Sequence, residues 1–293
     1  LEQRTECEIR VLVHDNASSD GTSSALERHV PEAEVEVSEE NLGFARAMNL
    51  LMKRSTAPWF FALNSDAWPE SGAIDVLVDA GERHQRAAAV APRLERPDGS
   101  LEASTHPFPS LKTALIDLTG GRHWMPRGHL EAMCLEGAWH HDRARSVDWA
   151  VGAALLMRRA ALEDLGGFDE RFFMYAEDLE WCWRARSAAW EVRFEPGALV
   201  RHIGNVSGEK RWGGGRLALE AANLRVLLPE MMGRRRAVVF RWVQAATCAE
   251  RLVSSRVLRR NEDAARWRTQ LKAHAGIAEH PPVRACAVAQ RTQ

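Results

Sequence analysis

The sequence lacks the features that mark secreted, membrane-spanning or disulfide-rich proteins. Its five cysteines are scattered over 293 residues, and no two of them form a C-x-x-C pair. That spacing argues against a disulfide framework or a zinc site and predicts reduced thiols in a cytosolic compartment. No stretch approaches the ~18 uninterrupted apolar residues of a membrane-spanning helix, and we recognise no signal-peptide pattern. We therefore expect a cytoplasmic protein.

An excess of charge of one sign is also missing. The 39 Lys and Arg nearly balance the 40 Asp and Glu, so the whole molecule has no electrostatic bias toward nucleic acid or a membrane. We find no internal repeat, and no Gly-rich, Lys-containing phosphate loop near the N-terminus, which argues against a nucleotidyltransferase. A chain of 293 residues suffices for one large α/β domain with an appendage.

Short apolar runs alternate with helical patterns in the first third of the chain. The predicted strands cover residues 9–13, 35–37, 59–63 and 87–91, and the predicted helices begin near 24 and cover 43–54 and 72–84. Strands that alternate with helices are typical of a doubly wound, mostly parallel sheet with helices on both faces. The sequence therefore predicts the α/β class.

Regular patterning stops at residues 93–146, which are rich in Pro, Gly, His and Trp. We interpret this segment as an irregular insertion, the kind of segment in which substrate specificity often resides. The pattern then returns, with predicted strands at 147–157, 191–194 and 198–202 and predicted helices at 159–165 and from 177 onward.

Acidic residues follow two of the predicted strands, where open α/β sheets bind ligands. Asp15 follows 9–13 and could accept a hydrogen bond from the imide N–H of uracil or thymine; its alternative role is to form a turn. Asp66 follows 59–63 and could hold a hard divalent cation that bridges a diphosphate. The alternative for Asp66 is again a strand-end turn.

Two further polar positions stand out later in the chain. Glu177 and Asp178 open a predicted helix, where acids either serve the helix dipole or act as a base toward a sugar hydroxyl. His202 ends a predicted strand and is either a metal ligand or a structural histidine.

Six stretches together resemble family 2 glycosyltransferases, particularly their bacterial rhamnosyltransferase-like branch. They are VHDNASSDGT at 13–22, NLGFARAMN at 41–49, FFALNSDAWP at 60–69, VGAALLMRR at 151–159, GGFDERFFMYAEDLEWCWRAR at 166–186 and EPGALVRHIGNVSG at 195–208. The resemblance covers about residues 1–212. It implies a GT-A fold, with a mixed and mostly parallel sheet, and inverting transfer from a nucleotide-diphosphate sugar.

The resemblance also implies roles for single residues. Asp15 corresponds to the acid that recognises the nucleotide base, and Asp178 to the catalytic base. Asp66 corresponds to the metal-binding carboxylate, and His202 stands where some members complete the site for Mg²⁺ or Mn²⁺. The further expected site residues are Asn16, Asn41, Gly43, Asn49, Asn64 and Ser65 for the donor, Glu177 beside the base, and Gly152, Trp181 and Arg184 for the acceptor.

The start of the chain departs from the family pattern. Family members open with one more βα unit, which is expected to be absent here. We interpret this as a fragment or a misassigned start, because the later motifs are intact. The resemblance implies a nucleotide-sugar donor, such as dTDP-rhamnose or a UDP-sugar, and a saccharide or polyprenyl-linked glycan acceptor in cell-wall or surface polysaccharide synthesis. The alternative is an inactive protein that binds nucleotide sugars as a scaffold.

Residues 213–275 combine helix-forming residues with many arginines, and 276–293 form a predicted loose tail. The arginines stand among apolar residues, as in basic amphipathic helices that lie on the inner face of the plasma membrane. The alternative is a helical cap that packs on the catalytic domain and leaves its arginines in solvent. Nucleic-acid binding is disfavoured because no motif for it accompanies the arginines.

Overall fold

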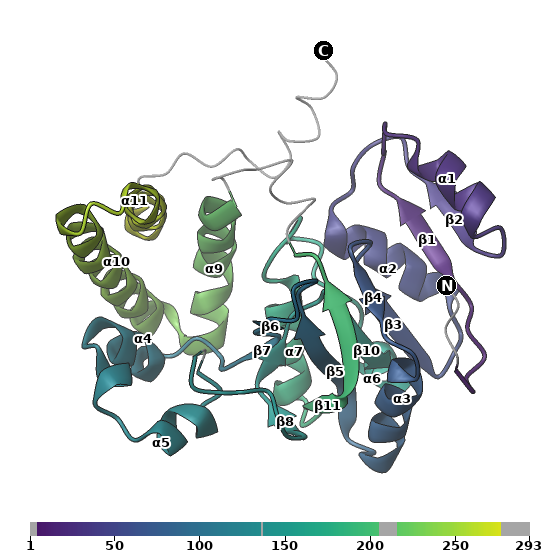
Figure 1. Ribbon diagram of the computed structural model, residues 1–293, viewed down its shortest axis with the longest axis horizontal. Coiled ribbons are helices and arrows are strands. Elements are labelled where there is room, and N and C mark those ends of the chain that lie inside the picture. The colour runs from purple at the N-terminus through teal and green to yellow at the C-terminus, as the bar shows by residue number, and fades with distance from the viewer. Residues whose placement is uncertain (1–4, 136, 205–215, 277–293) are drawn as a thin grey trace. The chain divides into compact units, whose positions relative to one another are not determined.

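The computed structural model of the chain describes residues 5–135, 137–204 and 216–276 (Figure 1). These residues form two compact units. The first comprises residues 5–106 and 141–204, and the second comprises 107–135, 137–140 and 216–276. The division differs from the predicted boundary at residue 212, because most of the expected insertion groups with the C-terminal helices.

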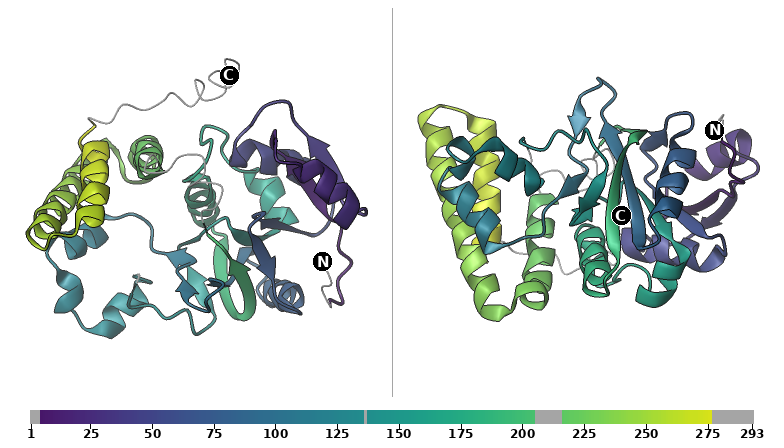
Figure 2. Two further views of the ribbon diagram at one scale, coloured as in Figure 1. Left: turned by 45° about the horizontal axis from the view of Figure 1, so that its top comes forward. Right: turned by 90° about the horizontal axis from the view of Figure 1, so that it is seen from below.

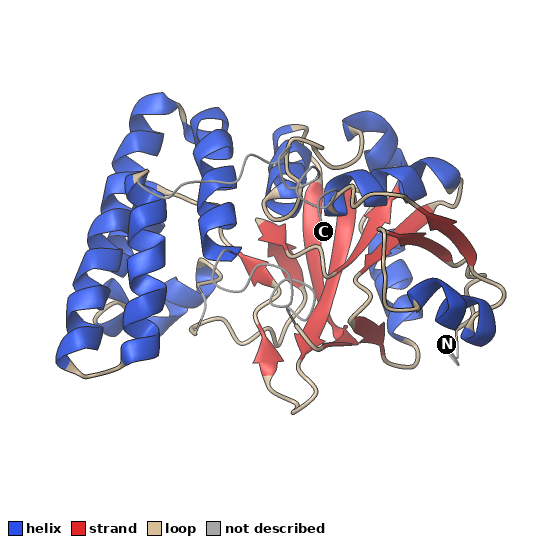
Figure 3. Ribbon diagram, turned by 90° about the horizontal axis from the view of Figure 1, so that it is seen from above, coloured by secondary structure: helices blue, strands red, loops and turns tan. Residues whose placement is uncertain are grey.

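The first unit consists of strands and helices in alternation. Its strands are β1 (Leu12–Asp15), β2 (Glu34–Val37), β3 (Trp59–Leu63), β4 (Ala67–Pro69), β5 (Ala87–Glu95), β6 (Leu101–Glu102), β7 (Thr105–His106), β8 (Arg145–Val147), β9 (Trp149–Ala150), β10 (Ala154–Arg158) and β11 (Glu191–His202). Its helices are α1 (Thr22–His29), α2 (Phe44–Arg54), α3 (Ala73–Arg83), α6 (Arg159–Leu165) and α7 (Glu177–Ser187). Figure 3 shows helices on both sides of the strands, which confirms the α/β class.

The main sheet has seven strands, in the order β3-β10-β5-β11-β4 with β6 added to β5 and β8 added to β11. β3, β5 and β11 run in one direction, but β10 lies between β3 and β5 and runs the opposite way. β1 and β2 form a separate parallel pair, and β7 and β9 a small antiparallel pair. Within the described main sheet only β5 and β11 pair in parallel. The sheet is mixed, as predicted, but it is not mostly parallel.

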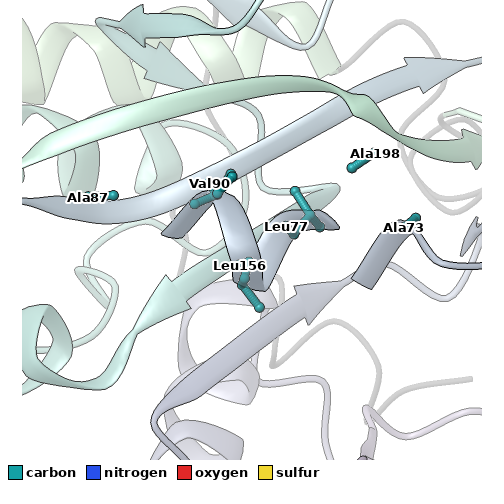
Figure 4. Packing of buried hydrophobic residues seen from close by; sticks show 7 residues of the cluster. Ala73, Leu77, Ala87, Val90, Leu156 and Ala198 are labelled. Carbon is teal, nitrogen blue, oxygen red and sulfur yellow. The ribbon is translucent and has the colours of Figure 1, made fainter. Parts of the chain in front are cut away.

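β5 forms the core of the first unit because both of its faces are covered. Val90 of β5 is 0% exposed and packs in one cluster with Leu77 of α3 and Leu156 of β10 (Figure 4). Gly81 lets α3 approach Trp59 of β3 closely, because a Cβ at Gly81 would lie 2.3 Å from the Trp59 ring. This packing fixes β3, whose C-terminal end carries part of the candidate site.

The second unit is helical throughout its described regular structure. Its elements are α4 (Leu111–Leu118), the 3-10 helix η1 (Gly121–His123), α5 (Arg127–Ala132), α9 (Arg216–Met232), α10 (Arg234–Val257) and α11 (Asn261–Ala275). Figure 2 shows α9, α10 and α11 packed beside one another. Phe240 of α10 and Leu228 of α9 pack with Ala114 of α4, which explains why the segment around α4 joins the C-terminal helices. No helix in the described residues combines the length and the hydropathy needed to cross a membrane.

Candidate active site

The turn after β3 carries the predicted Asn-Ser-Asp motif. Ser65 is exposed, whereas Asn64 and Asp66 are partly buried. The Asn64 N–H donates to the carbonyl oxygen of Ala153 at 2.9 Å, and the Ala67 N–H donates to the carbonyl oxygen of Asn64 at 3.1 Å. These bonds fix the turn where β3 ends and β10 begins. This edge of the sheet is where open α/β folds bind ligands.

His202 ends β11 beside this turn. β11 pairs with β4 so that His202 lies opposite Ala67, one residue after Asp66. The imidazole Nε2 is 3.3 Å from Oδ1 of Asp66, and Nδ1 is 3.0 Å from Oε2 of Glu102. Burial disfavours the charged ring, but the two carboxylates outweigh it and raise the pKa of His202 to about 9. The ring therefore carries an extra proton at neutral pH when no metal is bound.

Asp66 and His202 fit one side of a divalent-metal site. Nε2 of His202 is buried and makes no well-formed hydrogen bond with a described residue. Glu102 holds the other ring nitrogen, as outer-shell carboxylates do for metal-binding histidines. The described residues contain no cluster of three or more His, Cys, Asp or Glu arranged to hold a metal, so a bound diphosphate would have to supply further ligands.

Glu102 is the residue of this arrangement that the sequence did not point to. It lies on β6, inside the segment 93–146 that was interpreted as irregular, and it pairs with a histidine 100 positions later. A strand of two residues leaves no periodic signal. An isolated Glu in an irregular segment gives no reason to select it.

Asp178 opens α7 and is tied to the same edge of the sheet. Its Oδ2 accepts a hydrogen bond from the Gly152 N–H at 2.9 Å, and its Oδ1 accepts one from the Leu179 N–H at 2.8 Å. Gly152 directly precedes Ala153, whose carbonyl oxygen accepts the bond from Asn64. Two adjacent backbone groups therefore link the predicted base to the predicted metal-binding turn.

Glu177 is the buried member of the acid pair. It is 5% exposed, and its Oε2 has no hydrogen-bond partner among the described residues. Burial, and then the charge of Asp178, raises the pKa of Glu177 well above its usual range. A carboxyl with a raised pKa holds its proton more tightly than an ordinary glutamate, which disfavours it as the resting base. Of the two predicted catalytic acids, this favours Asp178 as the base.

The backbone before α7 is held in an unusual conformation. Tyr175 and Ala176 have φ values of 68° and 76°, which are sterically unfavourable for residues other than glycine. Such residues persist only where their surroundings enforce them, and they are frequent at functional sites. Here they direct the chain into the helix whose first turn carries both acids.

Two residues predicted to contact the acceptor make contacts that hold α7 in place. Trp181 is 0% exposed, and its Nε1–H donates to the carbonyl oxygen of Gly166 at 2.9 Å. Arg184 pairs with Glu180 at 2.6 Å and donates to the carbonyl oxygen of Gly167 at 2.8 Å. A side chain without exposed surface cannot touch an acceptor, so the structure does not support that contact for Trp181. The Arg184 side chain is 27% exposed, so its contact with the acceptor stays a prediction.

Asp15 organises the loop after β1. Its Oδ1 accepts from the Ser18 N–H at 2.9 Å, and its Oδ2 accepts from the Ser23 hydroxyl at 2.5 Å. Burial opposes ionisation, but these hydrogen bonds outweigh it, so the net pKa of Asp15 is lowered. The turn-forming role is present in the structure, and recognition of a nucleotide base stays a prediction.

Three other residues that are predicted to bind the sugar donor lie in a hydrogen-bonded cluster with this loop. Asn16 accepts the Leu42 N–H on Oδ1 at 2.6 Å and donates from Nδ2 to the carbonyl oxygen of Gly43 at 3.3 Å. Asn41 accepts the Gly43 N–H on its Oδ1 at 2.9 Å. The loop after β1 and the segment before α2 therefore form one hydrogen-bonded cluster.

Asn49, also predicted to bind the donor, is buried in a structural contact. Its side chain donates to the carbonyl oxygen of Phe168 and accepts the N–H of the same residue, each at 2.8 Å. The neighbouring Gly167 is confined, because a Cβ there would lie 2.2 Å from Oδ1 of Asn49. Asn49 thus anchors the loop after α6 to α2, and the structure gives no support to a direct donor contact.

Comparisons with known proteins relate the chain to sugar transferases. A family model described as Glycosyl transferase family 2 matches residues 1–166. The N-acetylglucosaminyl-diphospho-decaprenol L-rhamnosyltransferase of Mycobacterium tuberculosis (strain ATCC 25618 / H37Rv) is 34% identical over 217 residues, which cover 69% of each chain. The pre-mycofactocin glycosyltransferase of the same strain is 30% identical over 160 residues, or 55% of this chain and 30% of that protein.

A solved structure has a similar fold. The mannosyltransferase PcManGT from Pyrobaculum calidifontis, in complex with GDP-Man and Mn2+, gives a TM-score of 0.52 at 17% identity, covering 97% of this chain and 78% of that one. At this identity the likeness supports the GT-A fold alone. The family match covers more than half of the chain and includes the Asn-Ser-Asp turn and Gly152. The chain therefore belongs to glycosyl transferase family 2.

Proposed function

We propose that this protein transfers a sugar from a nucleotide-diphosphate sugar to an acceptor hydroxyl, with inversion at the anomeric carbon. The relative at 34% identity is named as an L-rhamnosyltransferase for N-acetylglucosaminyl-diphospho-decaprenol. By this likeness we assign dTDP-rhamnose as the first donor to test and a polyprenyl-linked glycan as the acceptor, with UDP-sugars as the alternative donors. Such a reaction belongs to cell-wall or surface polysaccharide synthesis.

The observation that carries the proposal is that a candidate metal-binding pair and a candidate base lie at the same edge of the main sheet. Asp66 and His202 approach within 3.3 Å of each other, as the protein ligands of a metal would. Asp178 is connected to the same turn through the adjacent backbone groups of Gly152 and Ala153. Transfer from a diphosphate sugar needs both a centre for the leaving group and a base for the acceptor.

Asp66 and His202 would hold Mg²⁺ or Mn²⁺, which when bound supplies positive charge to the leaving diphosphate. The proton on Nε2 of His202 must be lost before that nitrogen can act as a ligand. Glu102 then keeps the ring oriented through Nδ1. The donor diphosphate would supply further ligands.

On the acceptor side, Asp178 takes the hydroxyl proton while the oxygen attacks the anomeric carbon. Attack occurs on the face opposite the nucleotide, so the configuration inverts and no covalent enzyme intermediate is needed. Two backbone N–H groups hold both oxygens of Asp178 in place, which fixes the direction in which the base points.

The first test is calorimetric binding of UDP and dTDP to this chain, each with and without Mn²⁺. We expect binding that requires the metal, and the preferred nucleotide identifies the class of donor. Asp66→Ala should lose the metal-dependent part of the affinity. Asp79→Ala is the matched control, because Asp79 is an exposed acid of α3 in the same unit and is not one of the predicted site residues.

The second test is transfer itself, measured with dTDP-rhamnose and a soluble polyprenyl-diphosphate-N-acetylglucosamine analogue. Metal-dependent nucleotide binding together with transfer supports the proposal. Binding without transfer to any acceptor would instead identify a protein that binds nucleotide sugars without catalysis. Binding that is equal with and without Mn²⁺ contradicts the role assigned to Asp66 and His202.

A further inference from the structure

The helix α10 carries apolar residues on two faces. Its inner face carries the buried residues Ala237, Phe240, Cys248 and Leu252 and packs within the second unit. Its outer face carries five large exposed hydrophobic residues, which we call the α10 stripe. The stripe consists of Val238 (48% exposed), Val239 (49%), Trp242 (65%), Val253 (61%) and Val257 (77%).

The spacing of the α10 stripe makes it continuous along the helix. From Val239 onward its residues recur at steps of three, eleven and four positions, which return to the same side of an α-helix, and Val238 lies four positions before Trp242. Ala246 is exposed and lies between the two halves of the stripe. At a rise of about 1.5 Å per residue, the 24 residues of α10 give a helix roughly 36 Å long, of which the stripe from Val238 to Val257 covers roughly 28 Å.

Exposed arginines stand at both ends of the α10 stripe. Arg234, Arg235 and Arg236 open the helix, and Arg256, Arg259 and Arg260 follow Val253. None of these six side chains makes an ion pair with another described residue. Glu250 is the acid that is exposed along this face.

The helix itself does not account for the first arginine cluster. The N-terminus of an α-helix carries partial positive charge, so three cations there oppose the helix dipole, and no acid in the first turn of α10 offsets them. A cluster that is unfavourable for the isolated helix is consistent with an anionic partner outside it. The same partner must also cover apolar side chains.

We infer that the α10 stripe lies on an anionic lipid surface. A helix of this kind lies in the plane of the bilayer, with its apolar residues among the acyl chains and its arginines extended to the lipid phosphates. Both ends of the stripe then meet negative charge, which matches the two clusters. The inference deepens the proposed function and rests on it in one respect: it brings the enzyme to the surface that would hold a polyprenyl-linked acceptor.

A second copy of the chain fits the α10 stripe less well. Antiparallel pairing of two α10 helices would place Arg234–Arg236 of one against Arg256–Arg260 of the other. Parallel pairing would place each cluster against itself. Both arrangements bring cations together around an apolar seam, which disfavours the pair.

The test is flotation of the full chain with vesicles, in the absence of donor and acceptor. We expect binding to vesicles of equimolar phosphatidylglycerol and phosphatidylcholine, and little binding to phosphatidylcholine alone. Replacing Trp242 and Val253 together by Ser should weaken binding by about tenfold or more, because both side chains enter the lipid. The matched control is Trp124→Ser, since Trp124 is 70% exposed in the same unit but lies outside α10.

A second variant tests the charge separately. Replacing Arg235 and Arg256 by Gln should weaken binding to the anionic vesicles and reduce its dependence on salt. Unchanged circular dichroism and melting of each variant show that the fold is kept. Equal binding to both kinds of vesicle, or the same loss in Trp124→Ser as in the Trp242 and Val253 variant, would overturn the inference.

Self-association is the remaining outcome of the test. A wild-type dimer in solution that the Trp242 and Val253 variant dissociates, together with absence of vesicle binding, would assign the α10 stripe to a second copy and overturn the lipid inference. Because no sugar chemistry enters these measurements, their failure leaves the proposed transfer intact. A failure of transfer likewise leaves the vesicle result intact.

Discussion

Replacing Asp178 by Asn removes the proposed base with the smallest change of shape. In the protein, Oδ2 accepts from the Gly152 N–H at 2.9 Å and Oδ1 accepts from the Leu179 N–H at 2.8 Å. The amide has one oxygen, so one of these two N–H donors loses its acceptor. We expect the loss to destabilise the fold by about 1–3 kcal/mol, a cost that a folded domain can tolerate.

The effect of Asp178→Asn on transfer should be much larger. An amide cannot accept the acceptor proton, and loss of a positioned general base typically lowers the rate by ~10²–10⁴-fold. Donor binding should stay nearly unchanged, because Asp66 and His202 are intact. The measurements are initial rates at saturating donor and calorimetric donor affinity, made on the same preparations.

Glu177→Gln is the matched control, one residue earlier in the same turn. Burial and the Asp178 charge raise the pKa of Glu177 and so favour its protonated form, and Gln has the shape of that protonated acid. Transfer should therefore persist in Glu177→Gln. If Glu177→Gln abolished transfer and Asp178→Asn kept it, the assignment of the base would be refuted.

Glu177→Gln should also change how the stability of the protein depends on pH. A carboxyl whose folded pKa lies above its unfolded value binds more protons when folded, so it makes stability fall as pH rises above about 4.5. The slope is about 1.4 kcal/mol per pH unit for one proton. Glu177→Gln should flatten that fall, and denaturant unfolding between pH 5 and pH 8, at roughly one-unit steps, measures it.

Two further predictions concern other parts of the first unit. In metal-free protein, His202 has a pKa raised from 6.5 to about 9, so the stability it contributes, about 3 kcal/mol at most, is present below pH 6.5 and is lost as pH rises through about 9. Unfolding in EDTA across this range should show the loss, Glu102→Gln should reduce it, and a stability that is flat over this range would contradict the arrangement. Gly167→Ala should destabilise the protein by about 1–3 kcal/mol, because the new Cβ would meet Oδ1 of Asn49 at 2.2 Å. Denaturant unfolding measures the effect, and the control is Gly128→Ala in α5 of the second unit, where a Cβ has nothing within 4 Å and a neutral or slightly stabilising effect is expected.

The sequence predicted the positions of the strand ends better than the directions of the side chains. Asp66 and His202 were expected near each other because the family resemblance assigns both to one metal site, and the pairing of β11 with β4 brings them together. Trp181 was expected to face the acceptor because a motif contains it. A motif fixes the position of a residue along α7, whereas packing decides which face of the helix is buried.

The sequence also could not predict contacts that depend on distant partners. Glu102 and His202 are 100 residues apart, and the Glu102 strand is too short to leave a pattern. The segment around α4 had no periodicity that assigned it to either unit. Its place beside α10 depends on Ala114 meeting Phe240, a contact that only the folded chain contains.

Gly152 is predicted to contact the sugar acceptor. Adding a single methyl group at this position tests that role. A Cβ at Gly152 would lie 3.5 Å from Cβ of Asp178 and 3.7 Å from its Oδ2, which is ordinary contact distance, so Gly152→Ala should keep the fold and the Asp178 hydrogen bond. The methyl group would nevertheless occupy space beside the oxygen that must reach the acceptor hydroxyl. We expect a higher KM for the acceptor with an unchanged donor affinity, measured by steady-state kinetics and calorimetry. An unchanged acceptor KM would mean that the acceptor approaches Asp178 from another side and that Gly152 serves only to hold the base.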